Sequence, residues 1–533
     1  MTYLRRKTHQ ISVGKLTIGS DAPIRIQTMA NTDTNDIEAS VAQAKRCIAA
    51  GTELLRYTTQ GVRETENLRT IHDSLQTDGI DTPLVADIHF NPHVAEVAAQ
   101  YVEKVRINPG NFVAGHTGEY TDKEWNDELD KIRTKLRPLL DICKTRSTAI
   151  RIGVNHGSLS PRIMSRYGNT PLGLATSCME FISLCEKEDF HNIILSVKAS
   201  NTIVMVHAVR LLVQMMDKAD IHYPLHLGVT EAGSDTEGRI KSAVGIGTLL
   251  HSGIGDTIRV SLSESPEAEI PVAQHLASYI AEEYSAEDND SDTTSLRTTF
   301  SRRGTTAVGI FGGNNPVRVI GNVSSDKAAL QPDAALTDTP QEVKIIEVSQ
   351  SPRMLSIRNL IDNLNSTGNK APIVASINYP NISLEELQLR AAADFGPMLL
   401  DGLLDGIHIT TDNSTITDNE LTDTAYTILQ AARSRISRTE YTSCPSCGRT
   451  KFDLPTVVRQ VKEATKGYVG LKIAIMGCIV NGPGEMADAD YGYIGAGMGR
   501  VSIFHHNKCV EKNIPETEAL NRLINLIETT RNK

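Results

Sequence analysis

Residues 23–284 repeat one hydrophobic pattern along the chain. Each repeat has a short apolar, β-branched run, a polar turn, and a longer stretch whose apolar residues recur at helical spacing. Eight such runs occur: PIRIQTM, TELLRYT, PLVADIH, EKVRINP, AIRIGVN, IILSVKA, PLHLGVT and TIRVSLS. Eight strand–helix repeats are typical of a (β/α)8 barrel, whereas an open doubly wound sheet usually has five or six strands. The pattern therefore predicts an N-terminal TIM barrel.

Two of the stretches between these runs also carry helix-end signals. In DIEASVAQAKRCIAAG, Gly51 suits a left-handed residue just past the end of a helix. In NTIVMVHAVRLLVQMM, Asn201 is placed to cap the first turn.

The pattern changes after residue 284. The acidic, polar stretch SAEDNDSDTTSL predicts an exposed linker. Beyond it, VKIIEVSQ and PIVASINYP predict strands, and PRMLSIRNLIDNL and SLEELQLRAAADF predict helices. We interpret Asp401, Asp405 and His408 in this segment as turn and packing residues, because Asp-Gly pairs between apolar runs are usually turns. We expect three domains: a barrel over 1–284, an inserted α/β spacer over 285–435, and a C-terminal α+β domain over 436–533.

Length and composition restrict the class of protein and the compartment that the sequence allows. A chain of 533 residues exceeds the usual size of one domain. Its net charge of −10 argues against a nucleic-acid partner, because binding to the phosphate backbone needs a basic face. Eight cysteines are too few for a disulfide framework and indicate reduced thiols. Since no long apolar run or secretory signal is found, we expect no membrane partner and a cytoplasmic protein, or a plastid one only if a transit peptide has been removed.

Cationic residues lie within or just after five of the eight predicted strands. They are Arg56, Arg106, Arg151, Lys198 and Arg259. The carboxyl ends of barrel strands meet at one mouth, so these side chains predict a pocket for a ligand of about two to four negative charges, above all a phosphate or diphosphate. For any single one of them, the alternative is an ion pair with a neighbouring carboxylate, or an outward-facing side chain.

Other polar residues fall at the same strand ends. Asn155, Ser196, Ser261 and Ser263 are candidate neutral donors. Asp87, His89 and Glu231 are candidates for holding hydroxyl groups or moving protons. His89 would equally suit a structural bond to a loop carbonyl. Glu231 in GVTEAG is the stronger candidate, because a carboxylate beside so many cations needs a role or a partner, and its alternative is a counter-ion to one of the arginines.

The C-terminal segment holds two cysteine motifs. CPSCGR supplies Cys444 and Cys447, and MGCIVNGPGE supplies Cys478 and Glu485. A CxxC pair alone favours zinc, but a structural zinc site usually has a second close pair of Cys or His, and none lies near Cys478. Cys509, with His505 and His506 beside it, keeps a zinc site open, although its strand-like surroundings also suit a buried thiol.

Glu485 offers a fourth ligand of a different kind. A carboxylate is a harder and more exchangeable donor for iron than a thiolate, so it would leave one iron of a cubane cluster open to substrate. The preceding NGPG predicts a stiff turn in which glycines allow close backbone approach. The alternative is a surface turn with a solvated glutamate. The glycine-rich GAGMGR, residues 495–500, would lie against the cluster or against phosphate, although it is a weak phosphate motif.

Together these motifs resemble a known family. PLVADIHFNP, RINPGN, IRIGVNHGS, SVKAS, PLHLGVTEAG, IGDTIRVSLS, CPSCGR and GCIVNGPGE are similar to the 4-hydroxy-3-methylbut-2-enyl diphosphate synthases, iron-sulfur enzymes of the methylerythritol phosphate route to isoprenoids. The resemblance covers the barrel and the C-terminal segment. Residues 285 to about 430 depart from the two-domain form and resemble the three-domain form, which has an extra barrel-related domain.

The resemblance implies a reaction and a set of roles. The reaction is reductive ring opening and dehydration of 2-C-methyl-D-erythritol 2,4-cyclodiphosphate by two one-electron transfers through a 4Fe-4S cluster, with ferredoxin or flavodoxin as donor. The implied cluster ligands are Cys444, Cys447, Cys478 and Glu485. The implied diphosphate contacts are Arg56, Arg106, Arg151, Lys198 and Arg259, with Asn155, Ser196 and Ser261 beside them and Glu231 as an acid near the substrate.

The resemblance leaves the assembly open. In the two-domain form the cluster domain of one chain serves the barrel of another, so a homodimer is expected there, whereas the inserted segment would let a chain close on itself. Two other functions also stay open. One is a non-redox phosphate-binding barrel with a structural zinc ribbon, and the other, suggested by fold alone, is a pterin or corrinoid methyl-transfer barrel.

Overall fold

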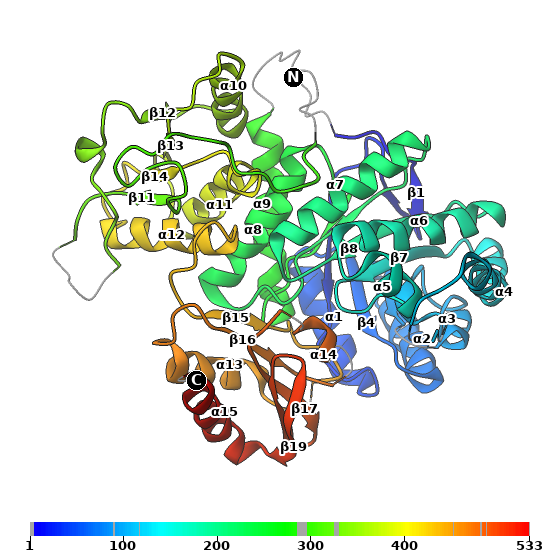
Figure 1. Cartoon of the computed structure of the whole chain (residues 1–533). Coiled ribbons are helices and arrows are strands. Elements are labelled where there is room, and N and C mark those ends of the chain that lie inside the picture. The colour runs from blue at the N-terminus through cyan, green and yellow to red at the C-terminus, as the bar shows by residue number, and fades with distance from the viewer. Residues whose placement is uncertain are drawn as a thin grey trace. The chain divides into compact units, whose positions relative to one another are not determined.

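The computed structural model describes residues 5–88, 91–113, 115–116, 118–284, 296–324, 330–450, 452–479, 482–486 and 488–531. The chain forms two compact units. The barrel unit consists of Arg6–Ser234, Ile254–Ala273 and Thr439–Lys533, and the insert unit consists of Met1–Arg5, Asp235–Gly253 and Gln274–Arg438 (Figure 1). None of the described helices is long and apolar enough to cross a membrane.

Eight parallel strands form the predicted barrel. They are β3 (Arg25–Met29), β4 (Leu54–Thr58), β5 (Leu84–Asp87), β6 (Lys104–Ile107), β7 (Ala149–Asn155), β8 (Ile193–Lys198), β9 (His226–Leu227) and β10 (Thr257–Ile258). Their order is β8-β7-β6-β5-β4-β3-β10-β9, and a parallel bridge between Leu195 and Leu225 joins the two ends of the sheet. The prediction of a TIM barrel is therefore confirmed, although β9 and β10 are shorter than their apolar runs suggested.

The barrel strands alternate with helices as expected. In the barrel unit these are α1 (Ile37–Ala49), α2 (Val62–Thr77), α3 (Pro92–Ala98), the 3-10 turn η1 (Pro109–Asn111), α4 (Asp122–Arg146), α5 (Pro161–Tyr167), α6 (Pro171–Lys187) and α7 (Thr202–Lys218), and α9 (Pro266–Glu283) begins there. Asn201 caps α7 by accepting from the backbone N–H of Ile203 at 3.0 Å, and Gly51 follows α1 with φ of +101°, as its position predicted. An antiparallel pair that the sequence did not reveal, β1 (Ile11–Val13) and β2 (Leu16–Ile18), packs its apolar side chains against the first residues of the barrel strands.

The C-terminal part of the barrel unit, Thr439–Lys533, is called the cysteine domain below. Its five-stranded sheet runs in chain order through β15 (Glu440–Ser443), β16 (Lys472–Met476), β17 (Tyr491–Gly497), β18 (Arg500–His505) and β19 (Lys508–Pro515). The helices α13 (Leu454–Thr465) and α15 (Glu516–Arg531) pack on the sheet through a core that includes Val461, Ile475, Tyr493 and Leu523. The predicted α+β character of this segment is confirmed.

The insert unit contains a parallel sheet of four strands. They are β11 (Arg318–Ile320), β14 (Gly406–Thr410), β13 (Ile373–Asn378) and β12 (Lys344–Val348), in that spatial order, with η2 (Leu336–Asp338), α10 (Arg353–Ser366), α11 (Leu384–Leu400) and α12 (Asp418–Ala431). The two strands and two helices predicted here are present, whereas β11, β14 and α12 were not predicted. The predicted linker lies outside the described residues except for Leu296.

Helix α8 (Asp235–His251) belongs to the insert unit by its contacts. It packs on α11 so closely that a Cβ on Gly247 would lie 2.9 Å from the Cβ of Ala393. The acidic residues of the LLDGLLDG run are buried in the same unit. Asp401 accepts from Arg358 Nη1 at 2.5 Å, and Asp405 accepts from the backbone N–H of Ile373 at 3.0 Å, which supports the packing interpretation of these residues.

Candidate active site

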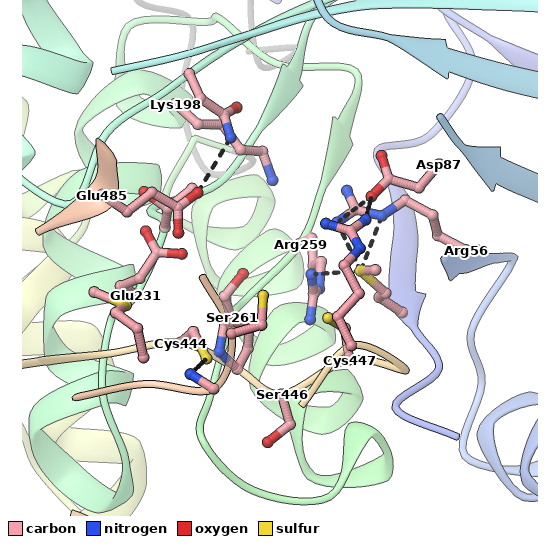
Figure 2. Close-up of a pocket in the computed structure, with 18 of the residues that line it drawn as sticks. Arg56, Asp87, Lys198, Glu231, Arg259, Ser261, Cys444, Ser446, Cys447 and Glu485 are labelled. Carbon is pink, nitrogen blue, oxygen red and sulfur yellow. Dashed lines mark hydrogen bonds and ion pairs between the residues drawn. The ribbon is translucent and has the colours of Figure 1, made fainter. Parts of the chain in front are cut away.

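A cavity lies at the carboxyl ends of the barrel strands, and the cysteine domain forms its other wall (Figure 2). The structure brings most of the predicted site residues into the lining of this cavity, whereas Ser263 is not among the lining residues. On the barrel side these are Arg56, Asp87, Arg106, Arg151, Asn155, Ser196, Lys198, Glu231, Arg259 and Ser261, and on the cysteine-domain side they are Cys444, Cys447, Cys478 and Glu485. Residues far apart in sequence thus share one site within a single chain.

Strand register explains why the charged side chains converge. Asp87 on β5 is the register partner of Arg106 on β6, which is in turn the partner of Arg151 on β7. Residues that pair across parallel strands point to the same face, so a row of charges forms along the inside of the barrel. The short strand length of β5 and β6 places this row at the mouth and not in the middle of the barrel.

The described part of the protein does not fully pair the cations of the cavity, and Arg151 shows this most clearly. Arg151 is 1% exposed, and its Nε and Nη1 have no hydrogen-bond partner in the described part of the chain. Burial, followed by the nearby Arg56 and Arg106, holds the pKa of Arg151 well below its usual value. Burial also lowers the pKa of Arg56 to about 10, although Asp87 opposes the shift. Buried, incompletely paired guanidinium groups are costly unless an anion meets them, so this cavity suits a polyanionic ligand.

Two of the cations donate hydrogen bonds to carboxylates, and Arg56 forms a longer ion pair with Asp87 at 3.9 Å. Arg259 makes a forked pair with Glu269, from Nε to Oε2 and from Nη2 to Oε1, both at 3.0 Å. Arg106 donates from Nη1 to Asp87 at 3.1 Å and from Nη2 to the carbonyl of Gly153 at 2.9 Å. The ion-pair alternative therefore holds for these side chains, yet all three still line the cavity.

The cysteine domain docks onto the barrel of its own chain. The Ser263 hydroxyl lies 2.7 Å from the Ser443 hydroxyl and donates to the carbonyl of Cys444 at 2.9 Å. At another contact the backbones of Gly157 and Gly484 touch, and a Cβ on Gly157 would lie 2.0 Å from the Gly484 carbonyl oxygen. Only glycine fits such an approach, which agrees with the reason given for the glycines of NGPG.

The thiol and carboxylate groups gather on one side of the cavity. The backbone N–H of Gly477 donates to Cys444 Sγ at 3.2 Å, and burial, then the neighbouring Cys447, raises the pKa of the Cys444 thiol. In Figure 2 the carboxyl groups of Glu485 and Glu231 point toward one another. Burial, followed by the charge of Glu231, holds the pKa of Glu485 well above its usual value.

This donor set fits an iron-sulfur cubane. Among the described residues no three His, Cys, Asp or Glu side chains are gathered tightly enough to hold one metal ion. In a cubane, however, each ligand binds a different iron, so its ligands surround the cluster and do not converge on one point. Three thiols and one carboxylate on a common cavity wall, with a backbone N–H bonded to sulfur, match that requirement.

The structure corrects three expectations about the cysteine domain. Cys509 is exposed and not buried, because it lies on the edge strand β19. Residues 482–485 of NGPGE form one helical turn, α14 (Gly482–Glu485), in place of the expected simple turn. GAGMGR forms the β17–β18 hairpin, whose Gly495 lies against Gly477 while Met498 is 87% exposed. Neither this hairpin nor His505, His506 and Cys509 are among the residues that line the cavity.

Some residues of the cavity were not predicted, and some predicted residues lie outside the part of the chain that the structure describes. Met29, Thr230, Ser446 and Arg449 line the cavity, and Glu269 acts on it through Arg259. Arg449 had a signal in its place two residues after the CxxC pair, whereas Glu269 lies in the first turn of α9, where an acidic residue is common and does not mark a site. His89 and Asn481 lie outside the described residues.

Fold and site together define a class: a TIM-barrel protein for an anionic ligand, closed by a domain that presents three thiols and a carboxylate. Comparison with known proteins agrees. Residues 8–274 match the GcpE TIM-barrel domain, and residues 440–529 match the GcpE protein C-terminal domain. The chain is 46% identical to a 4-hydroxy-3-methylbut-2-en-1-yl diphosphate synthase (flavodoxin) from Phocaeicola vulgatus, over 99% of this chain and 98% of the relative. The chain belongs to the GcpE family of 4-hydroxy-3-methylbut-2-en-1-yl diphosphate synthases.

More distant relatives carry the same name. The synthases (flavodoxin) of Porphyromonas gingivalis and Leptospira interrogans are 45% and 38% identical, each over 99% of this chain and over 98% and 97% of their own lengths. Among solved structures, a dihydropteroate synthase from Xanthomonas albilineans is similar to 52% of this chain and 98% of its own, at 13% identity and a TM-score of 0.36. That likeness is too low to bear on function.

Proposed function

We propose that this chain catalyses the reductive ring opening and dehydration of 2-C-methyl-D-erythritol 2,4-cyclodiphosphate to 4-hydroxy-3-methylbut-2-enyl diphosphate. The observation that supports this most is the single cavity with strand-end cations on one wall and three thiols and a carboxylate on the other. Family membership gives the reaction, and the cavity has the charge and the donors that the reaction needs. Opening the ring and releasing water takes up two electrons and two protons.

The cysteine-domain wall would hold the cofactor. We assign Cys444, Cys447, Cys478 and Glu485 as the ligands of a 4Fe-4S cluster. The cluster, when bound, supplies single electrons at low potential, and its carboxylate-bound corner is the most exchangeable. Asn155 Nδ2 lies 3.4 Å from Oε1 of Glu485 and would steady this carboxylate from the barrel side.

The barrel wall would bind and orient the substrate. Arg56, Arg106, Arg151, Lys198 and Arg259 would hold the two phosphates, with Asp87, Asn155, Ser196 and Ser261 completing the set. Arginine offers two parallel donors to a phosphate, which fixes orientation as well as charge. Closure of the cysteine domain on the barrel excludes water and brings the reacting carbon–oxygen bond to the thiolate wall.

Glu231 is the strongest candidate for moving a proton. It follows β9, is 4% exposed, and has a left-handed backbone conformation with φ of +49°. Non-glycine residues in this conformation cost energy and are found often where a side chain must be aimed at a ligand. Its carboxyl group faces the Glu485 side of the cavity (Figure 2).

The electron donor proposed for this chain is taken from the names of its relatives. Their printed name gives flavodoxin as electron donor, and we propose flavodoxin or ferredoxin for this chain. We place the reaction in the cytoplasm. The inserted segment, residues 285–435, would act as the spacer that lets one chain supply both walls of the site, so a homodimer is not needed to complete it.

Anaerobic purification tests the function against the zinc-ribbon alternative. The proposal expects a brown protein with about four irons per chain, and turnover of the cyclodiphosphate with a strong one-electron reductant. A colourless protein with stoichiometric zinc and no turnover would favour the non-redox alternative.

A further inference from the structure

Arg449, the last residue of CPSCGR, lines the same cavity as the strand-end cations but comes from the cysteine domain. It is 3% exposed. We propose that Arg449 belongs to the diphosphate-binding set, as the cation that the cysteine domain contributes, and that Asp87 positions it. The inference rests on the function proposed above.

Asp87 joins Arg449 to the cations of the barrel. Its Oδ2 accepts from Arg449 Nη2 at 3.2 Å, and its Oδ1 accepts from Arg106 Nη1 at 3.1 Å. Arg56 Nη2 lies 3.9 Å from the same carboxylate. One carboxylate cannot neutralise three guanidinium groups, so this buried cluster keeps an excess of positive charge. A phosphate group bound beside Asp87 would offset that excess.

The guanidinium group of Arg449 also has an N–H donor that the described part of the protein does not use. Its Nε is buried and lacks a hydrogen-bond partner in the described part of the chain. A guanidinium group has five N–H donors and no acceptor, so an anion with several oxygens is the ligand that best satisfies the remaining ones.

The backbone on both sides of Arg449 is fixed before any ligand arrives. At Gly448 an added Cβ would lie 2.7 Å from the carbonyl oxygen of Thr32 in the barrel. On the other side, the Thr450 hydroxyl accepts from the backbone N–H of Cys447 at 3.1 Å. A side chain held in this way loses little freedom on binding, so its contact with phosphate adds affinity.

A purely structural ion pair would give different results. If Arg449 only fastened the cysteine domain to the barrel through Asp87, its loss would affect stability and not the salt-sensitive affinity for a diphosphate. If it also binds substrate, its loss weakens affinity and reduces the dependence of affinity on ionic strength, because one cation fewer faces the phosphates.

The test uses the anaerobic holoenzyme. Arg449→Gln and Arg449→Lys are compared with Arg459→Gln, which makes the same charge change at an exposed position in α13 of the same domain. Calorimetric titration of the oxidised holoenzyme with the cyclodiphosphate gives Kd, and steady-state turnover gives KM and kcat. We expect Arg449→Gln to raise Kd and KM roughly ten- to hundredfold with unchanged iron content, Arg449→Lys to raise them less, and Arg459→Gln to leave them unchanged.

Asp87→Asn tests the positioning role. In that background Arg449→Gln should cause a smaller loss of affinity than in the wild-type chain, because the partner that aims the guanidinium is already gone. If Arg449→Gln loses iron, the affinity of the Arg449→Lys variant tests the inference instead, because lysine keeps the positive charge but lacks the two parallel N–H donors of arginine. Wild-type Kd and KM in an iron-replete Arg449 variant would overturn this inference alone. Failure of the wild-type holoenzyme to bind or convert the cyclodiphosphate would overturn the proposed function.

Discussion

The Glu269 carboxylate on α9 accepts two hydrogen bonds of 3.0 Å each from the guanidinium group of Arg259, which directly follows β10. Both side chains are nearly fully buried. The same carboxylate accepts from the Thr28 hydroxyl at 2.8 Å and from the backbone N–H of Leu262 at 3.1 Å. All the acceptor capacity of Glu269 is thus directed at the barrel mouth. It is a positioning residue, which fixes Arg259 without reaching the cavity itself.

Replacing Glu269 by Gln should therefore destabilise the barrel unit and weaken substrate binding together. Removal of one partner from a buried pair leaves an uncompensated charge and costs about 3–5 kcal/mol in the free energy of unfolding. Glu267→Gln is the matched control, because its pair with Arg46 is partly exposed to solvent and should be worth at most about 1 kcal/mol. Denaturant unfolding measures both variants, and equal losses for the two would contradict the role given to Glu269.

The contact between Gly157 and Gly484 should be essential for closure. Gly484→Ala places a Cβ 2.6 Å from the carbonyl oxygen of Gly157, so the NGPGE turn has to move away from the barrel. We expect turnover to fall by at least about tenfold while most of the iron is retained. Gly467→Ala is the control, since a Cβ there has no neighbour within 4 Å. Anaerobic activity and iron assays on both variants check this, and an active Gly484→Ala enzyme would count against it.

Replacing single cysteines of the cysteine domain should distinguish those that bind the cluster from the one that does not. Cys478→Ser should abolish iron binding, whereas Cys509→Ser should leave the iron content nearly unchanged because Cys509 is exposed on an edge strand. Glu485→Gln should keep much of the iron but lose turnover, since three thiolates hold the cluster while the exchangeable corner is altered. Iron analysis decides the assignment, and the reverse pattern for the two cysteines would reassign the third ligand.

Substrate affinity should fall as pH rises. Burial, then Arg151 and Arg56, holds the pKa of Lys198 well below its usual value, so its charge is present at low pH and lost as pH rises through that lowered pKa. A bound diphosphate favours the charged form, so binding takes up a proton at Lys198. In Lys198→Arg the charge persists, and this part of the pH dependence should disappear. Titrations of wild type and variant across pH test this, and identical profiles would exclude Lys198 as the source.

The sequence predicted the barrel and the cavity lining because both depend on local signals. Each strand run was apolar and β-branched, and a cation embedded in such a run, as in LLRYT, is conspicuous by itself. Glu269 was missed because its partner lies ten residues away on another element, and only the folded barrel shows that they meet. Strand β14 was missed because its run GIHIT follows two Asp-Gly pairs that suggested turns. Cys509 was misjudged because a strand pattern does not reveal whether the strand lies at an edge.

The Mössbauer spectrum of the iron-57-loaded holoenzyme tests the central claim, that Glu485 completes a cluster whose open corner faces the cationic mouth of the barrel. The account predicts one iron distinct from the other three, with parameters of oxygen ligation that change when the cyclodiphosphate is added and that are altered in Glu485→Gln. A spectrum of four equivalent thiolate-bound irons, insensitive to the substrate and to Glu485→Gln, would contradict it.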